Sequence, residues 1–160
     1  MELSRFTDYA LRVLMYAAAR SPQKVTLREL ADSYRVSQHH LVKIVHKLGT
    51  LGYLHNQRGR SGGIYLGRAA EDIRVGDVVR HTETHLNFVE CFSAHGNQCC
   101  ITPACQLKGV FHDARDAFLQ VLDTCTIADL VKNRAALLRL IHPIASAKMG
   151  ALSYSLHQAT

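Results

Sequence analysis

Apolar residues near the N-terminus recur at steps of three and four residues, which is the spacing of one buried helix face. The series runs from Phe6 to Ala18 and predicts an amphipathic helix over about residues 4–20. The dipeptide Ser21-Pro22 then ends the pattern, because proline lacks the amide hydrogen that a continuing helix needs.

Two further helices are predicted between residues 26 and 52. Thr26 and Glu29 have the spacing of a capping box, so the second helix is expected to begin there. Ser37 can cap a third helix, whose apolar positions between Leu41 and Leu51 face inward and which ends at Gly52. The two helices are joined only by residues 34–36, and such a pair forms a helix-turn-helix.

The pattern changes directly after the third helix. Residues 53–57 and 64–66 read as two short strands around the sequence Arg-Gly-Arg-Ser-Gly-Gly at 58–63. Glycines allow the backbone to take positive φ and to approach a duplex closely, and two arginines one residue apart can enter a narrow minor groove. This hairpin is the predicted wing.

The basic charge is concentrated over the third helix and the hairpin. The net charge is +6, and none of the 13 acidic residues lies between residues 33 and 70. The polar face of the third helix is suited to reading base edges in a major groove, and the hairpin to contacting the backbone. The residues expected to bind DNA are Gln38, His39, His40, Lys43 and Lys47 in the helix and Arg58, Arg60 and Ser61 in the hairpin.

Four of the five cysteines lie in one aperiodic stretch, residues 88–105. They are Cys91, Cys99, Cys100 and Cys105, and clustered thiols on a loop can wrap a soft metal centre such as an iron-sulfur cluster or zinc. Structural zinc typically takes C-x2-C pairs, whereas the only close pair here is the directly adjacent Cys99-Cys100. The loop leads into a long amphipathic helix predicted for about residues 103–123, and Cys125 continues its apolar stripe as a packed residue.

The composition is 48% hydrophobic and 20% charged, which is typical of a soluble globular protein. No apolar stretch approaches the roughly 20 residues of a membrane span, and the N-terminus lacks a signal-peptide pattern, so a cytoplasmic protein is expected. Cytosolic thiols stay reduced, so metal ligands, redox groups or packed residues are expected rather than disulfides. No nucleophile-base constellation, phosphate-binding motif or cofactor fingerprint points to an enzyme.

Six sequence blocks carry a resemblance to a known family. They are F-T-D-Y-A-L-R at 6–12, V-S-x-x-H-L-V-K-I-V at 36–45, R-G-R-S-G-G-I-Y-L at 58–66, I-R-V-G-D-V-V-R at 73–80, C-C-I-T-P-A-C at 99–105 and T-I-A-D-L-V at 126–131. With these blocks the chain, up to about residue 140, resembles the winged-helix iron-sulfur regulators, the family of NsrR and IscR. The cysteine block is similar in particular to the NsrR-type nitric-oxide-sensing repressors of that family.

The resemblance implies an iron-sulfur cluster held by Cys91, Cys99 and Cys105, and it favours a 4Fe-4S over a 2Fe-2S cluster. Cys100 stands at a position that need not be cysteine in the family. Asp8 matches an acidic residue that completes the cluster from the partner subunit in some members. The resemblance further implies a repressor that releases its operator when nitric oxide attacks the cluster.

The predicted fold is mainly α: a winged helix-turn-helix with a small two-stranded wing and a long C-terminal dimerisation helix. Residues 1–82 are expected to form the DNA-binding domain, 83–105 the cluster loop, 106–142 the dimerisation helices and 143–160 a disordered tail. A two-fold homodimer places two recognition helices about one DNA turn apart, so the double-stranded operator is expected to be an imperfect palindrome.

Two other functions remain open from the sequence. A regulator of cluster assembly similar to IscR would hold a 2Fe-2S centre, but Lys108 stands where such members have a histidine ligand, and His112 lies one turn further on. A redox switch without a cluster would instead oxidise Cys99 or Cys100.

Overall fold

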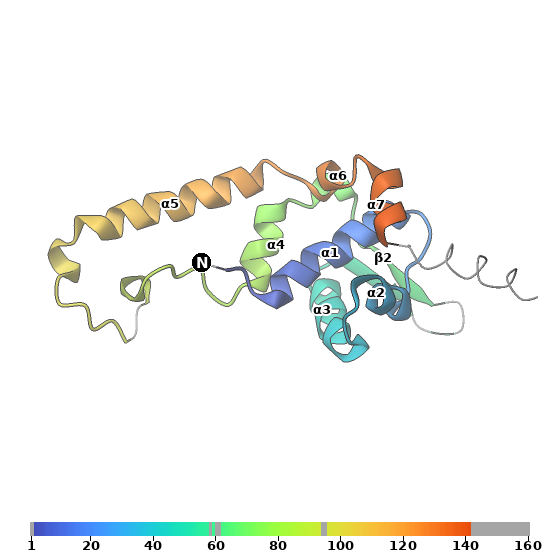
Figure 1. The fold of residues 1–160 in the computed structure, drawn as a ribbon, viewed down its shortest axis with the longest axis horizontal. Coiled ribbons are helices and arrows are strands. Elements are labelled where there is room, and N and C mark those ends of the chain that lie inside the picture. The colour runs from blue at the N-terminus through green and yellow to red at the C-terminus, as the bar shows by residue number, and fades with distance from the viewer. Residues whose placement is uncertain (1, 58, 60–61, 94–95, 142–160) are drawn as a thin grey trace, which may run out of the picture.

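The computed structural model describes residues 2–57, 59, 62–93 and 96–141, and it is mainly helical with one small sheet (Figure 1). The body contains helices α1 (Arg5–Arg20), α2 (Leu27–Tyr34), α3 (Gln38–Thr50) and α4 (Val75–Thr82) with strands β1 (Leu54–Gln57) and β2 (Gly63–Leu66). Helices α5 (Gln106–Asp123), α6 (Ile127–Leu130) and α7 (Arg134–Ile141) follow, and 3-10 turns lie at Ala70–Asp72, Glu90–Phe92 and Thr102–Ala104. The predicted mainly α fold with a two-stranded wing is confirmed.

The helix-turn-helix begins at the capping residues that the sequence predicts. The Thr26 hydroxyl accepts a hydrogen bond from the Glu29 amide at 3.1 Å, and the Glu29 carboxylate accepts one from the Thr26 amide at 2.6 Å. The Ser37 hydroxyl accepts from the His40 amide at 3.3 Å. These bonds satisfy amides that a first helical turn leaves unpaired, so they fix where α2 and α3 start.

The wing is fastened to the helical body at its base. β1 and β2 pair antiparallel over four residue pairs. Val25, in the connection between α1 and α2, bridges to Ile64 of β2, and the two residues exchange backbone hydrogen bonds of 3.0 and 2.8 Å. The three wing residues predicted to bind DNA, Arg58, Arg60 and Ser61, lie outside the described residues, as does the predicted tail at 143–160.

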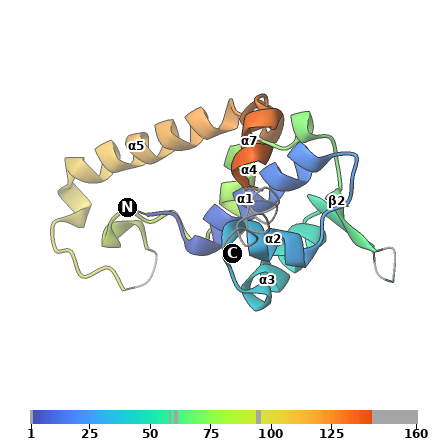
Figure 2. The same ribbon diagram turned by 45° about the vertical axis from the view of Figure 1, so that its right-hand side comes forward.

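The hydrophobic core includes residues from the C-terminal part of the chain. Leu14 and Leu41 of the helix-turn-helix region are fully buried in it, and so is Ile127 of α6, while Ile141 of α7 is 8% exposed. The Ile127 amide donates to the carbonyl of Ile73, just before α4, at 2.9 Å. Figure 2 shows α7 returning to the body, where it contacts α1. Helices α6 and α7 therefore complete the same core that holds α1 and α3.

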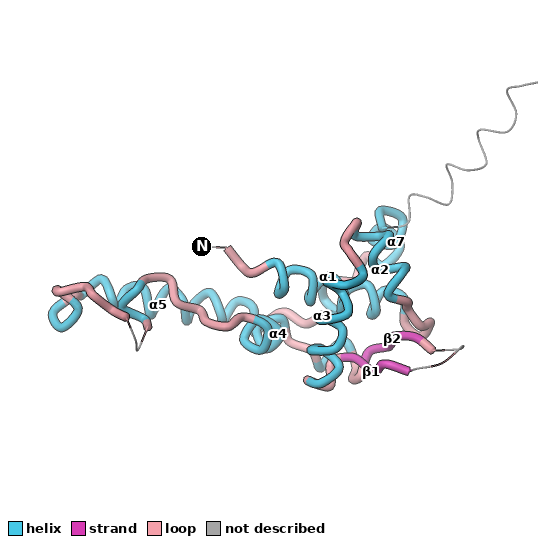
Figure 3. Tube along the Cα trace, turned by 90° about the horizontal axis from the view of Figure 1, so that it is seen from below, coloured by secondary structure: helices cyan, strands magenta, loops and turns pink. Residues whose placement is uncertain are grey.

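Helix α5 leaves this body and has the cysteine loop at its far end (Figures 1 and 3). None of its 18 residues is buried. The sequence pattern predicts a start near Pro103, but the helix begins at Gln106. Pro103 lies in a separate 3-10 turn, and Cys105 after it has an extended backbone (φ −80°, ψ 107°) that interrupts the helical path. Among the described residues, no helix combines the length and apolar character needed to cross a membrane.

The C-terminal end of α5 is joined to α4 by charged groups. Two guanidinium nitrogens of Arg80 donate to the two carboxylate oxygens of Asp123 at 2.6 and 2.7 Å, and Arg74 donates to the Asp123 carbonyl at 2.7 Å. The hydrogen bonds from Arg80 lower the pKa of Asp123, so the pair stays charged at neutral pH. Gly76 of α4 leaves room for this carboxylate, since a β-carbon there would overlap with it.

The start of α1 is tied to the end of α4. The Glu83 carboxylate accepts a hydrogen bond from the Ser4 amide at 2.8 Å, and the Thr7 hydroxyl donates to the Thr82 hydroxyl at 2.9 Å. Burial opposes ionisation of Glu83, but the hydrogen bonds from Thr7 and Ser4 outweigh it and lower the pKa of the carboxyl group. This junction fixes the helix turn that also carries Asp8.

Candidate DNA-binding face and cysteine loop

The outward face of α3 carries polar residues that the sequence predicts for DNA binding. Gln38, His39, Lys43 and Lys47 are exposed, and α3 contains no acidic residue. The apolar side of the helix is buried against α1 and α2, which fixes its backbone. The exposed side is therefore a rigidly held row of hydrogen-bonding and cationic groups, which suits a major groove.

His40 differs from this expectation. Its ring is half-buried and lies edge-to-face against Tyr9 of α1, with 5.6 Å between the ring centres. Each residue advances about 100° around a helix, so His40 falls at the margin between the exposed Lys47 and the buried Ile44. The structure thus places His40 in the contact between α1 and α3, at the edge of the face formed by the other predicted DNA-binding residues of the helix.

Val42 is a residue of this face that the sequence reasoning missed. Its side chain is 48% exposed, and it lies between the exposed His39 and His46 at helical spacing. The available signal was its offset from the buried positions, one residue after Leu41 and two before Ile44. In a major groove, the apolar group on the base edges is the thymine methyl, so Val42 adds a surface of different chemistry to the face.

Aromatic and hydrogen-bond contacts anchor the wing to α3 and α4. The Tyr53 hydroxyl and Nδ1 of His81 in α4 share a hydrogen bond of 2.8 Å. Arg68 donates to the Leu51 carbonyl at 2.9 Å, and its guanidinium carbon lies 4.6 Å from the centre of the Tyr53 ring. Burial raises the pKa of Tyr53, so its hydroxyl stays protonated at neutral pH. These contacts join the base of the wing and the end of α3 to α4.

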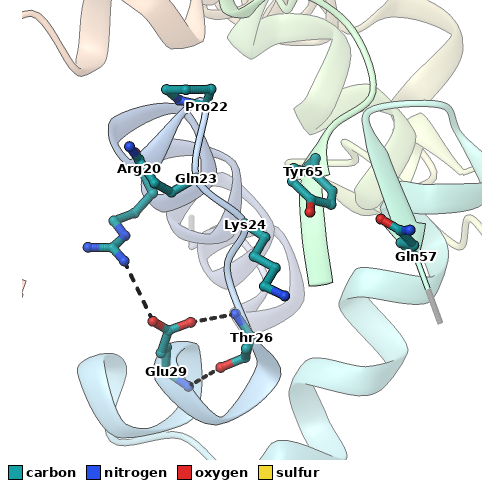
Figure 4. Close-up of a pocket in the computed structure, with 8 residues that line it drawn as sticks. All are labelled: Arg20, Pro22, Gln23, Lys24, Thr26, Glu29, Gln57 and Tyr65. Carbon is teal, nitrogen blue, oxygen red and sulfur yellow. Dashed lines mark hydrogen bonds and ion pairs between the residues drawn. The ribbon is translucent and has the colours of Figure 1, made fainter. Parts of the chain in front are cut away.

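An open hollow of about 740 Å³ lies at the base of the wing (Figure 4). Arg20 and Glu29 point toward one another on one side, 3.8 Å apart, and Gln57 and Tyr65 come from the strands on the other. The Glu29 carboxylate also accepts from the Thr26 amide as part of the helix cap. Because this carboxylate is already engaged by the cap and by Arg20, the hollow is a structural junction between α1, α2 and the wing.

The four thiols of the cysteine loop (residues 88–105) do not form a single cluster among the described residues. Cys99 and Cys100 are exposed, Cys91 is half-buried in the 3-10 turn Glu90–Phe92, and Cys105 is half-buried directly before α5. All are free thiols, and thiolates suit iron. Within the described ranges, no three His, Cys, Asp or Glu side chains are close enough together to hold a metal ion. The donor chemistry fits an iron-sulfur cluster, whereas the structure does not gather the donors.

Cys125 is half-buried, and its side chain packs against the hydrophobic core just beyond the end of α5. Its sulfur lies 3.7 Å from the carbonyl oxygen of Thr126. This environment is that of a packed residue, which agrees with the sequence prediction.

Asp8 lies on α1, and its carboxylate is paired with Arg12 one turn later in the same helix. Arg12 donates to one carboxylate oxygen at 2.9 Å and contacts the other at 2.9 Å. The side chains of both residues remain almost half exposed. The backbone carbonyl of Arg12 accepts a hydrogen bond from the Tyr34 hydroxyl of α2 at 3.0 Å, and burial raises the pKa of Tyr34 to about 12. The Asp8–Arg12 pair therefore stands beside a contact between α1 and the helix-turn-helix.

A winged helix with a basic, acid-free recognition helix defines a DNA-binding regulator as the class of this protein. Residues 3–133 match the Rrf2 family, described as iron-dependent transcriptional regulators, and the chain belongs to that family. It is 48% identical over 142 residues to the HTH-type transcriptional regulator NsrR of Geobacillus kaustophilus, and 47% identical over 142 residues to that of Bacillus subtilis. Each match covers 88% of this chain and 97% of the relative.

Solved structures show the same fold. The structure of CymR, the global cysteine regulator of B. subtilis, has a TM-score of 0.68 at 27% identity and covers 83% of this chain and 98% of its own. T. potens IscR has a TM-score of 0.67 at 25% identity, with 83% and 88% covered. The resemblance to NsrR-type regulators is confirmed, and the chain is a DNA-binding transcriptional regulator.

Proposed function

We propose that the chain is a homodimeric repressor that binds an imperfect palindromic operator and releases it in response to nitric oxide through an iron-sulfur cluster. One observation carries the proposal: four free thiols, among them Cys91, Cys99 and Cys105, lie on a single loop. This loop is at the end of the helix that leaves the DNA-binding body. The iron-dependent description of the family and the NsrR relatives support the same function.

Cys91, Cys99 and Cys105 would hold the cluster, for which we favour 4Fe-4S over 2Fe-2S. When bound, the cluster supplies iron atoms that react with nitric oxide. Binding requires the loop to bring its thiols together, and the exposure of Cys99 leaves that residue free of core packing that would resist the movement. Cys100 would be dispensable.

The dimer would form through α5. Leu107, Val110 and Val121 are 56%, 59% and 68% exposed, and they fall on one side of the helix together with the partly buried Phe118. Apolar surface of this kind is stabilised by burial against a second copy of the same helix. Two-fold pairing would present two α3 helices to successive major grooves of a palindrome.

Asp8 of the partner subunit would complete the cluster. Its carboxylate is held by Arg12 in the single chain, so binding iron would require Asp8 to exchange this partner. Arg12 lies next to the Tyr34 hydrogen bond, so the exchange would act at the boundary between α1 and α2. This provides a route from the cysteine loop of one subunit to the helix-turn-helix of the other.

Operator binding by one anaerobic preparation, before and after nitric oxide and after cluster removal, tests the proposal. We expect the cluster-loaded protein to bind more tightly than the other two forms by on the order of a hundredfold. We expect Asp8→Ala to bind the operator while losing most of that difference. Equal binding by all forms would mean that the cluster does not control this regulator, and tightest binding without the cluster would reverse the proposed switch.

A cysteine switch without iron is the second candidate, because Cys99 and Cys100 are adjacent and both exposed. It predicts anaerobically purified protein with neither iron nor visible absorption, and operator binding that changes on treatment with a thiol oxidant. Iron and sulfide analysis of the anaerobic protein separates the two functions.

A further inference from the structure

The part of the cysteine loop that contains Cys91 is stacked on α5. The rings of Phe92 and His112 are nearly parallel, with 4.1 Å between their centres and 17° between their planes. Phe88 stacks on Phe92 at 6.3 Å, and the guanidinium carbon of Arg115 lies 5.3 Å from the centre of the Phe92 ring. His112 and Arg115 are one turn apart, so Phe92 rests on one face of α5. Cys91 precedes Phe92 in the same 3-10 turn, and its position follows from this stack.

The part of the loop that contains Cys99 is tied to the same turn. The Glu90 carboxylate accepts a hydrogen bond from the Gln98 amide at 2.7 Å. Glu90 is the direct neighbour of Cys91, and Gln98 is the direct neighbour of Cys99. This bond therefore links the two cysteine-bearing segments across the intervening residues.

The backbone around Cys99 is held on both sides by two polar side chains. Asn97 accepts from the Cys99 amide at 3.1 Å, and the Thr102 hydroxyl donates to the Cys99 carbonyl at 2.8 Å. The side-chain amide nitrogen of Asn97 also donates to the Thr102 hydroxyl at 3.0 Å. The segment from Asn97 to Thr102 is thus internally ordered, and it runs directly into Cys105 and α5.

We propose that Glu90 and His112 are positioning residues, which hold the Cys91 and Cys99 segments close to each other and to the start of α5 before any cluster is present. His112 acts by stacking on Phe92 and not as an iron ligand. These roles rest on the proposed cluster site, and they concern the geometry of the cysteine loop before it binds a cluster. They include one for the histidine that stands one turn beyond Lys108.

The proximity of the Cys91 and Cys99 thiols can be tested with dibromobimane, a reagent that becomes fluorescent when it links two thiols. The protein used is cluster-free and reduced, and serine replaces all cysteines except Cys91 and Cys99. We expect Glu90→Ala and His112→Ala to slow linkage within one chain by about two- to tenfold, which is the scale of one aromatic or hydrogen-bonded contact. Glu90→Gln keeps an acceptor and His112→Phe keeps a stacking ring, so both should restore the rate. Asp113→Ala, an exposed change on the same turn of α5, is the control.

Cluster assembly is then measured in the full-length protein with all cysteines, as iron, sulfide and visible absorption after anaerobic reconstitution. We expect His112→Phe to assemble the cluster as the unchanged protein does and His112→Ala to assemble it more slowly. Linkage that is unaffected by the alanine variants would overturn the positioning role. A cluster lost in His112→Phe, with linkage retained, would show that His112 is a ligand. Linkage that follows the prediction in a protein that takes up no iron would reject the cluster and leave the positioning contacts standing.

Discussion

Replacing Ile127 by alanine tests whether the C-terminal helices belong to the folding unit that binds DNA. Ile127 is fully buried, and its amide donates to the carbonyl of Ile73 at 2.9 Å. Alanine removes three carbon atoms, which at about 0.8 kcal/mol each accounts for about 2.4 kcal/mol. The cavity left behind raises the expected loss to about 2–5 kcal/mol of unfolding free energy. A protein of this size has on the order of 5–15 kcal/mol in total, so the change is large.

The measurement is urea unfolding followed by circular dichroism at one fixed protein concentration, since the stability of a dimer depends on concentration. We expect one cooperative transition that moves as a whole to lower urea. Leu130→Ala in the same short helix is the control, because Leu130 is 39% exposed and its loss should cost less than about 1 kcal/mol. If residues 1–82 instead fold independently, the Ile127→Ala protein will show two transitions, with the one from the DNA-binding helices unmoved.

Three other predictions concern the site and its supports. Cys105→Ser should abolish iron binding after anaerobic reconstitution, whereas Cys100→Ser should leave it largely intact. Lys43→Ala should weaken operator binding, reduce the slope of log affinity against log salt by about one and alter the preference among operator variants, whereas Lys132→Ala, on an exposed residue after α6, should do none of these. Glu83→Gln should lower the urea midpoint at neutral pH. Because the pKa of Glu83 is lowered in the folded state, its contribution to stability is present above the ordinary carboxyl pKa. It is lost as pH falls through the lowered pKa, so the urea midpoints of the two proteins should converge in acid.

Local signals in the sequence predict most of the DNA-binding region. The capping box at Thr26 and Glu29 and the cap at Ser37 act over three residues, so their effect is readable without knowing the fold. The side of α3 that faces the core follows from helical periodicity. At the margin of that face, periodicity does not decide whether a residue is exposed or buried. The half-buried position of His40 depends on its contact with Tyr9, which is 31 residues away in the chain.

Contacts between distant segments could not be predicted in this way. Ile127 is held in the core by the bridge between Thr126 and Arg74 and by the hydrogen bond from its own amide to the Ile73 carbonyl. The long helix begins late because the backbone of Cys105 is extended. The stack of Phe92 on His112 joins a loop without periodicity to a helix, and no pattern in the sequence pairs these rings. Motifs identify the cysteines as a group, but the spatial arrangement of the four thiols depends on the path of the loop, which has no periodicity.

The attachment of α5 at one end gives the molecule a lever. Eighteen residues at about 1.5 Å per residue make a rod about 27 Å long, held to α4 by Arg80 at one end and joined to the cysteine loop at the other. Turning such a rod by about 5° about its attachment moves the far end by about 2.4 Å. Conversely, a displacement of a few ångströms in the cysteine loop would rotate α5 by a few degrees about its attachment to α4. Because Tyr53 and His81 link α4 to the base of the wing, a rotation of α4 would be passed on to the wing.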